Sequence, residues 1–184
     1  AIGRFKTFDE AVTSLTEYNP SSFGTYLKDE KDIREIYLSL FEVNQGDKDI
    51  VLKELETSME GKANTQDDYY TTEGVISTVL KKYPGDIGCV FPLMMNVVHV
   101  APGEALYLEP DTLHAYVKGN GMELMTASDN VLRGGLTPKR IDLKELSSLL
   151  YFGPSFPENV KKREKNGIIN YMTPSPDFML SRMD

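Results

Sequence analysis

The chemistry of this sequence centres on its two histidines, which are the side chains best suited to bind a metal ion or transfer a proton at neutral pH. His99 lies among valines with no acidic residue close in sequence, which favours an ordinary structural role. His114 begins the run His-Ala-Tyr-Val, directly before a Lys-Gly-Asn-Gly turn at 118–121. If this turn closes a two-residue hairpin, the alternation of side chains along strands places His114, Tyr116 and Glu123 on one face.

An imidazole, a phenol and a carboxylate on one face are typical of a metal ligand with its hydrogen-bonded neighbours. They are equally typical of the polar lining of a β-barrel, and the residues alone leave both interpretations open. One imidazole cannot hold a catalytic zinc ion, which takes three or four protein ligands. The sequence has no His-x-His, no His-x-x-x-His and only one cysteine, Cys89. Any metal bound by His114 therefore requires distant carboxylates or residues outside this chain.

A second chemically suitable segment spans 128–140 and reads Ser-Asp-Asn-Val-Leu-Arg-Gly-Gly-Leu-Thr-Pro-Lys-Arg. Arg133, Lys139 and Arg140 are cations in an acidic protein, and the planar fork of arginine suits phosphate or a developing oxyanion. The two glycines after Arg133 would let the backbone approach a ligand closely. A loop with ordinary surface cations is the simpler alternative.

Hydrophobic residues at helical spacing dominate the first half of the chain and predict four helices. Their apolar faces begin at Phe8, Ile33, Val51 and Val75, and Thr72 is placed to start the last of them. Tyr-Pro-Gly-Asp at 83–86 then ends the helical region. We expect a mainly helical subdomain over residues 1–88.

Short β-rich runs separated by turn sequences follow from residue 90 and predict an antiparallel sandwich or barrel over 89–184. The segment 141–150 reads as one further helix, and 154–167 reads as a solvated loop. The fold class is therefore α+β. The expected strands are 97–100, 105–108, 114–117 and 122–125.

Composition excludes several classes of function. The chain has 184 residues, 40% of them hydrophobic and 26% charged, and a net charge of -8 that would repel nucleic acid. No apolar run approaches the length of a membrane span. A single cysteine forms no internal disulfide and favours a reducing, cytoplasmic location. The opening Ala-Ile-Gly-Arg-Phe lacks an initiator Met and a leader pattern, which fits a trimmed sequence or a piece of a longer protein.

Long, specific patterns mark the second half of the chain. They are Tyr-Pro-Gly-Asp-Ile-Gly at 83–88, Asn-Val-Val at 96–98, Pro-Gly-Glu-Ala-Leu-Tyr-Leu at 102–108, His-Ala-Tyr at 114–116 and Ser-Asp-Asn-Val-Leu-Arg-Gly-Gly-Leu-Thr-Pro-Lys at 128–139. Together they closely resemble type I phosphomannose isomerase. The tail Tyr-Met-Thr-Pro-Ser-Pro-Asp-Phe at 171–178 matches more moderately, and the helical first part matches only in architecture.

This resemblance implies a cupin-like β-sandwich with an inserted helical domain, and an enzyme that interconverts mannose 6-phosphate and fructose 6-phosphate with one zinc ion. It assigns His114 to the metal and Arg133 to catalysis. It assigns Lys139 to the substrate phosphate, and Tyr116 and Glu123 to substrate binding. Nucleic acid and membranes are not expected as partners.

Two positions depart from the family pattern, and two of its motifs are missing. Leu113 stands where the family usually has proline, and Gly134 stands where alanine is common. The Gln-x-His and Lys-Pro-Glu motifs that supply the other zinc ligands are absent. We therefore expect an incomplete part of the enzyme, inactive alone, whose missing ligands come from outside this chain, for example from an N-terminal companion fragment. A non-catalytic sugar-phosphate-binding protein is the alternative, and a purely structural module is a third.

Overall fold

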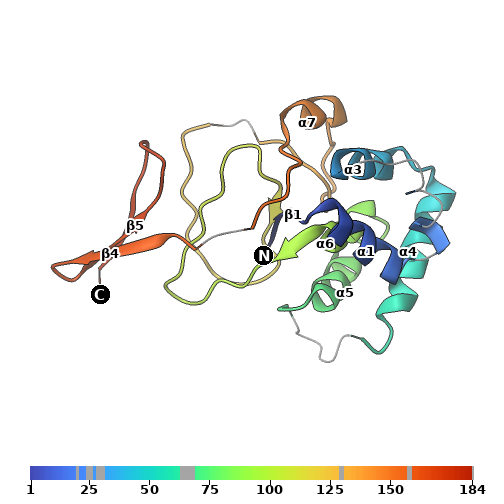
Figure 1. Ribbon diagram of the computed structural model, residues 1–184, viewed down its shortest axis with the longest axis horizontal. Coiled ribbons are helices and arrows are strands. Elements are labelled where there is room, and N and C mark those ends of the chain that lie inside the picture. Colours follow the sequence, from blue (N-terminus) through green and yellow to red (C-terminus); the bar gives the residue numbers. More distant parts are fainter. Residues whose placement is uncertain are drawn as a thin grey trace.

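A computed structural model describes residues 1–19, 21–23, 27, 32–62, 69–128, 131–156 and 159–183. Helices gather at one end of the molecule, one small sheet lies in the middle and a second lies at the far end (Figure 1). The elements are β1 (Ile2–Phe5), α1 (Phe8–Tyr18), α3 (Ile33–Glu42), α4 (Gln45–Met59), α5 (Thr72–Lys82), the 3-10 helix η1 (Ile87–Val90), α6 (Phe91–Met94), β2 (Met95–Val97), β3 (His114–Ala115), α7 (Leu143–Leu149), β4 (Lys161–Lys165), β5 (Ile168–Met172) and β6 (Leu180–Met183).

The four helices predicted in the first half are confirmed as α1, α3, α4 and α5, and the helix predicted near 141–150 is confirmed as α7. Each begins after a side chain that accepts a hydrogen bond from a free main-chain N–H of the first turn, which stabilises a helix start. These capping residues are Thr7, Asp32, Asn44, Thr71 and Asp142. Within the described part of the chain, no helix is long and apolar enough to cross a membrane.

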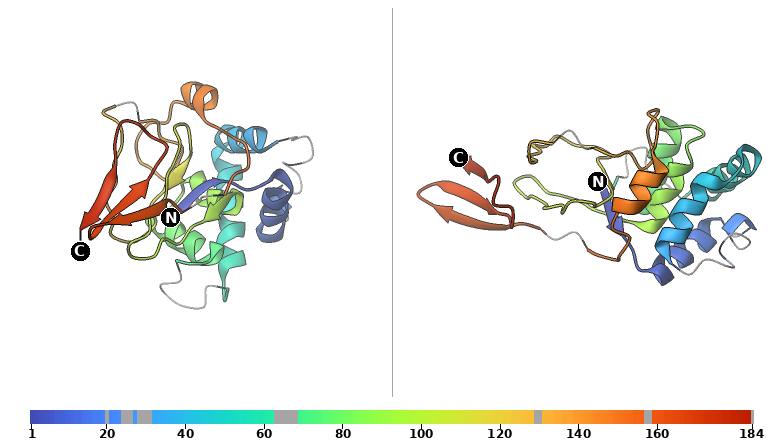
Figure 2. Two further views of the ribbon diagram at one scale, coloured as in Figure 1. Left: turned by 60° about the vertical axis from the view of Figure 1, so that its left-hand side comes forward. Right: turned by 90° about the horizontal axis from the view of Figure 1, so that it is seen from above.

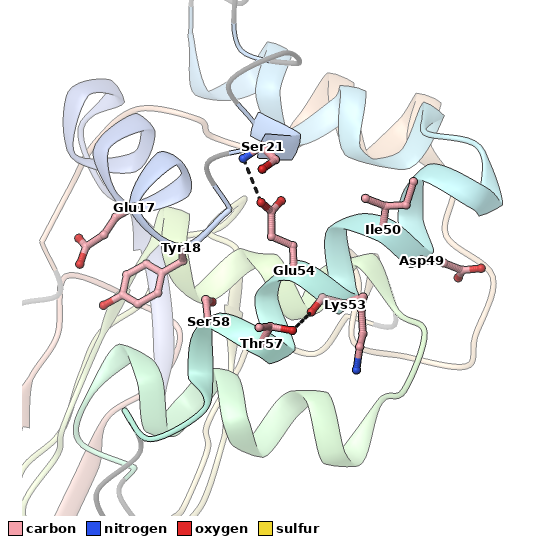
Figure 3. A pocket seen from close by; sticks show the side chains of 9 residues that line it. All are labelled: Glu17, Tyr18, Ser21, Asp49, Ile50, Lys53, Glu54, Thr57 and Ser58. Carbon is pink, nitrogen blue, oxygen red and sulfur yellow. Dashed lines mark hydrogen bonds between the residues drawn. The ribbon is translucent and has the colours of Figure 1, made fainter.

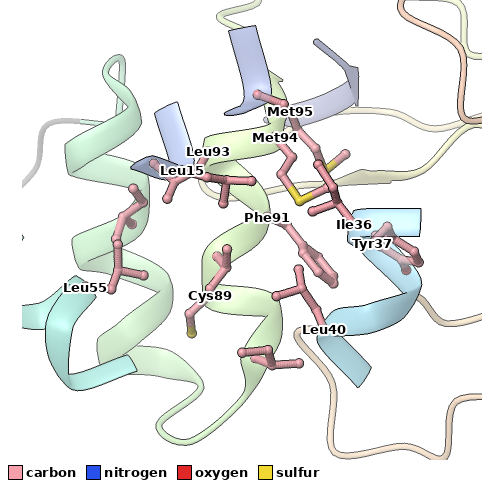
Figure 4. Close-up of a cluster of buried hydrophobic side chains, with 14 of the residues drawn as sticks. Leu15, Ile36, Tyr37, Leu40, Leu55, Cys89, Phe91, Leu93, Met94 and Met95 are labelled. Carbon is pink, nitrogen blue, oxygen red and sulfur yellow. The ribbon is translucent and has the colours of Figure 1, made fainter. Parts of the chain in front are cut away.

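The core of the helical end is the continuous apolar run from η1 through α6, all of which is buried. Helices α1 and α5 pack against α6. Phe91 points from α6 toward Tyr37 and Leu40 of α3 (Figure 4). Cys89 lies in this core, where burial raises the pKa of its thiol to about 12. The buried cysteine therefore stays a protonated thiol at neutral pH.

The central sheet has β1 in its middle, between β2 and β3, and both pairings are antiparallel. Gly3 pairs with Asn96 on one side and with His114 on the other. The first strand of the chain is thus the neighbour of the strand that carries the candidate metal ligand. The division into a helical subdomain 1–88 and a sandwich segment 89–184 stays a prediction.

The predicted strands were largely wrong in extent. Of 97–100 only Val97 is in β2, and of 114–117 only His114 and Ala115 are in β3. In the part of the chain that is described, 105–108 has a single bridge, Leu106 with Asn159, and 122–125 forms no strand. The reason is that a β-rich run becomes a strand only where a partner strand meets its hydrogen-bonding groups.

The segment 154–167, predicted to be a loop, instead contains β4. Lys165 pairs with Ile168 across a two-residue turn, and both Asn166 and Gly167 have positive φ, as a type I′ hairpin turn requires. The charged run 161–165 hid this strand, although lysines are common on exposed edge strands. The sheet β4–β5–β6 projects from the rest of the molecule (Figure 2), and the Tyr171 hydroxyl donates to the Gly103 carbonyl oxygen at 2.9 Å.

Candidate active site

His114 is exposed on β3, and its ring orientation is set by a neighbouring main-chain group. Its Nδ1 lies 2.9 Å from the carbonyl oxygen of Thr112. Because a carbonyl oxygen can only accept, Nδ1 carries the proton in this contact. In the neutral ring, the lone pair of Nε2 is then available to a metal or a substrate, which is the arrangement found in metal-binding histidines.

Tyr116 and Glu123 join His114, as the alternation argument predicted. The Tyr116 hydroxyl donates to Glu123 Oε1 at 2.8 Å, and the His114 and Tyr116 rings meet edge to face with centroids 5.7 Å apart. Partial burial and this hydrogen bond to a carboxylate raise the pKa of Tyr116 to about 12. The three groups converge even though the segments 114–117 and 122–125 do not pair as a hairpin.

Arg133 is brought to the same region through its neighbour Gly134. A methyl group added at Gly134 would stand 2.6 Å from Cδ1 of Leu113, so Leu113 and Gly134 adjoin. Leu113 packs against the core and Gly134 is buried, whereas His114 and Arg133 are exposed. The contact therefore joins the segment that carries the candidate ligand to the segment that carries the candidate catalytic arginine. Within the described residues, the Arg133 guanidinium forms no ion pair.

The glycines after Arg133 pack closely against the helical core, and their approach to a ligand stays a prediction. The Tyr37 hydroxyl donates to the Gly134 carbonyl oxygen at 2.6 Å. A methyl group at Gly135 would stand 2.4 Å from Phe91, and the φ of Gly135 is 127°. Helix α3 and helix α6 thus anchor the arginine-bearing loop. Sequence reasoning missed this because nothing local links residues 37 and 134.

Lys139 is exposed at the end of the same loop, which Asp86 holds in place. Asp86 accepts hydrogen bonds from the main-chain N–H of Thr137 at 3.0 Å and of Gly88 at 2.7 Å. Thr137 Oγ1 in turn accepts from the Lys139 N–H at 3.2 Å. Asp86 was interpreted from sequence only as part of a helix stop. Asp129 and Asn130 of the loop motif lie outside the described residues.

The described residues include no group of three or more histidine, cysteine, aspartate or glutamate side chains placed to hold a metal ion. His114 fits the role of one zinc ligand by its exposure and its ring orientation.

Known proteins share both the sequence and the fold. No protein-family model matches the chain. Mannose-6-phosphate isomerases of Salmonella typhimurium and Homo sapiens are 33% and 30% identical to it, covering 100% and 98% of this chain and 47% and 44% of theirs. A structure of the Salmonella typhimurium mannose 6-phosphate isomerase bound to fructose 6-phosphate and zinc matches with a TM-score of 0.82 and 29% identity. The chain is homologous to a segment of the mannose-6-phosphate isomerases.

This homology confirms the resemblance to the phosphomannose isomerases and the α+β, cupin-like fold class with antiparallel sheets. The structural match covers 98% of this chain and 46% of the Salmonella isomerase. The chain thus spans about half the length of the mannose-6-phosphate isomerases that it matches.

A groove of about 990 Å3 also opens in the helical part, between α1 and α4 (Figure 3). Tyr18, Ile50 and Thr57 are among its lining residues. Glu54 in this groove caps the main-chain N–H groups of Ser21 and Ser22 at 2.9 and 3.0 Å, so its carboxylate has a structural role. None of the five candidate site residues lines the groove.

The two departures from the isomerase pattern contact each other, which yields a prediction. Gly134→Ala is expected to destabilise the chain by about 1–3 kcal/mol, because the new methyl would overlap Leu113 and the Tyr37 hydroxyl. Adding Leu113→Pro, the usual family residue, is expected to restore part of that stability. Urea unfolding of both single variants and the double variant measures this coupling. Simple additivity of the two substitutions would contradict a compensating pair.

Proposed function

We propose that this chain is part of a zinc-dependent aldose–ketose isomerase that interconverts mannose 6-phosphate and fructose 6-phosphate. The observation that carries the proposal is the contact between Leu113 and Gly134, which joins the segment that carries His114 to the segment that carries Arg133. Homology to mannose-6-phosphate isomerases along nearly the whole chain supports it. A cytoplasmic location stays a prediction.

Arg133 and Lys139 supply positive charge in this proposal. Isomerisation moves a proton between C1 and C2 of the sugar through an enediolate, so negative charge develops on the sugar oxygens. The exposed guanidinium of Arg133 stabilises that charge, and it does so more in the transition state than in the bound sugar. Lys139 holds the phosphate as a point charge, away from the reacting carbons.

Tyr116 and Glu123 bind and orient the sugar. Tyr116 donates a hydrogen bond to Glu123, so the lone pairs of the phenol oxygen remain to accept a hydrogen bond from a sugar hydroxyl. With its pKa near 12, Tyr116 stays neutral at physiological pH and adds no negative charge next to the enediolate. Glu123 thereby keeps the phenol in one orientation.

Zinc, when bound, supplies Lewis-acid stabilisation of the same developing charge. His114 is one ligand, through Nε2, and the remaining ligands lie on polypeptide outside these 184 residues. Two observations support this: no three-ligand cluster occurs among the described residues, and the chain matches less than half of the zinc-bound Salmonella isomerase.

A non-catalytic sugar-phosphate-binding protein is the second candidate. The lack of a three-ligand cluster among the described residues favours it, because arginine and lysine can hold a sugar phosphate without a metal. This candidate predicts binding without turnover under every condition.

Calorimetry with mannose 6-phosphate, together with an isomerase assay, tests the proposal. The chain is measured alone and with the polypeptide segment that carries the family's Gln-x-His and Lys-Pro-Glu motifs, in the presence of zinc. We expect turnover only in the paired sample, and less than stoichiometric zinc in the dialysed chain alone.

Lys139→Ala should weaken mannose 6-phosphate binding by about tenfold to hundredfold, as expected for a lost charge-assisted hydrogen bond. Lys144→Ala removes another exposed lysine, on α7, and should leave affinity unchanged. Binding in both samples with no turnover in either would favour the non-catalytic candidate. Equal affinity of the Lys139→Ala variant and the unchanged chain would contradict the phosphate assignment.

A further inference from the structure

Two consecutive tyrosines connect the helical part to the end of the central sheet. The Lys118 ammonium lies 4.3 Å from the centre of the Tyr69 ring and donates to the Tyr69 hydroxyl oxygen at 3.1 Å. The Tyr70 ring lies 4.6 Å from the His99 ring, centre to centre. Both tyrosines come just before α5. They therefore reach from the start of a helix to the segments that follow two strands of the sheet.

Sheet topology explains why these partners come together. Because β2 and β3 are both antiparallel to β1, they run parallel to each other and end at the same edge of the sheet. His99 follows β2 and Lys118 follows β3. At that edge Tyr69 contacts Lys118, after β3, and Tyr70 contacts His99, after β2.

The segment that Lys118 anchors is the turn between Tyr116 and Glu123. Gly119 in this turn has a φ of 132°, and a methyl group added at Gly119 or Gly121 would meet nothing within 4 Å. The turn thus projects into open space and contains glycines, which lose more conformational freedom on ordering than other residues. A contact that holds Lys118 reduces the freedom of both ends of the Tyr116–Glu123 hydrogen bond.

We infer that Tyr69 is a positioning residue: its contact with Lys118 holds the 116–123 turn against the helical part and thereby maintains the Tyr116–Glu123 hydrogen bond. The inference relies on the proposed function only for the assignment of this pair to substrate binding. No assigned site residue belongs to the helical part, so Tyr69 would extend the candidate site to a second part of the chain.

The nuclear Overhauser contact between the Tyr116 ring protons and the Glu123 side-chain methylene protons, measured at pH 7 in the 13C-labelled chain, tests the inference without any sugar or metal. The Tyr116 hydroxyl lies 2.8 Å from Glu123 Oε1, so these protons stay close while the hydrogen bond holds the two side chains together. Tyr116→Phe, which keeps the ring and removes the hydrogen bond, gives the signal expected without it. Tyr69→Leu is expected to weaken the contact several-fold, and Tyr69→Phe, which keeps the ring over Lys118, to weaken it less.

Tyr70→Leu is the matched control, because Tyr70 contacts His99 and is expected to leave Tyr116 unchanged. An unchanged Tyr116 signal in folded Tyr69→Leu, or an equal change in Tyr70→Leu, would overturn the inference. If Tyr69→Leu does not fold, Lys118→Met decides. Lys118→Met removes the ammonium that contacts Tyr69, so a weaker Tyr116–Glu123 contact supports the positioning role and an unchanged contact overturns it. The result does not depend on whether the chain is an isomerase.

Discussion

Replacing Arg133 by alanine is expected to lower the rate constant kcat of the proposed isomerisation by about two to three orders of magnitude. This is the usual effect of removing one donor aimed at charge that develops in a transition state. The guanidinium is exposed, and the next residue, Gly134, contacts the Leu113 that precedes His114. Within the described residues the guanidinium has no ion-pair partner that would neutralise it. The measurement is turnover of mannose 6-phosphate, in the presence of zinc, by the chain paired with the segment that carries the Gln-x-His and Lys-Pro-Glu motifs.

Two further variants separate the role of the Arg133 guanidinium from simple charge. Arg133→Lys keeps the charge but loses the planar fork, so its rate should lie between those of alanine and arginine. Arg140→Ala removes a neighbouring exposed cation and should leave kcat near that of the unchanged enzyme. A large fall in affinity with kcat preserved in Arg133→Ala would instead make Arg133 a binding residue.

Replacing Tyr37 by alanine is expected to lower the free energy of unfolding by about 3–5 kcal/mol, the range for truncating a large buried aromatic side chain. Tyr37 is fully buried, and its ring centre lies between 4.9 and 5.8 Å from those of four phenylalanines. These are Phe5, Phe41, Phe91 and Phe152. Tyr37 lies on helix α3 and contacts strand β1 and the arginine-bearing loop, so the lost stability reports on the packing of all three. Urea unfolding at pH 7 measures it.

Tyr37→Phe is the control that keeps the ring and removes the hydrogen bond to the Gly134 carbonyl oxygen. Its expected loss is about 1–3 kcal/mol, because a buried acceptor is left without its donor. Burial raises the pKa of Tyr37 above the ordinary value of about 10. The folded state thus holds this proton more tightly than the unfolded state, so stability from Tyr37 is complete below about pH 10 and declines as pH rises further. Equal stability of Tyr37→Phe and the unchanged chain at pH 7 would contradict the anchoring role.

The convergence of the candidate site was predictable in part. Alternation along one short segment placed His114, Tyr116 and Glu123 together, and the structure joins them. The hairpin that this prediction assumed at 120–121 does not form, and the type I′ hairpin lies at Asn166–Gly167 instead. Both positions contain Asn-Gly, but among the described residues only Asn166–Gly167 is flanked by segments that pair with each other.

Local features of the sequence by themselves determined the helices, because a cap such as Thr7 or Asp142 and an apolar face at helical spacing both act within a few residues. Tertiary structure alone decided which β-rich runs became strands and where Arg133 lies. Strand hydrogen bonds and the contacts of Gly134 with Leu113 and Tyr37 join residues far apart in sequence, and they form only when the whole chain is folded.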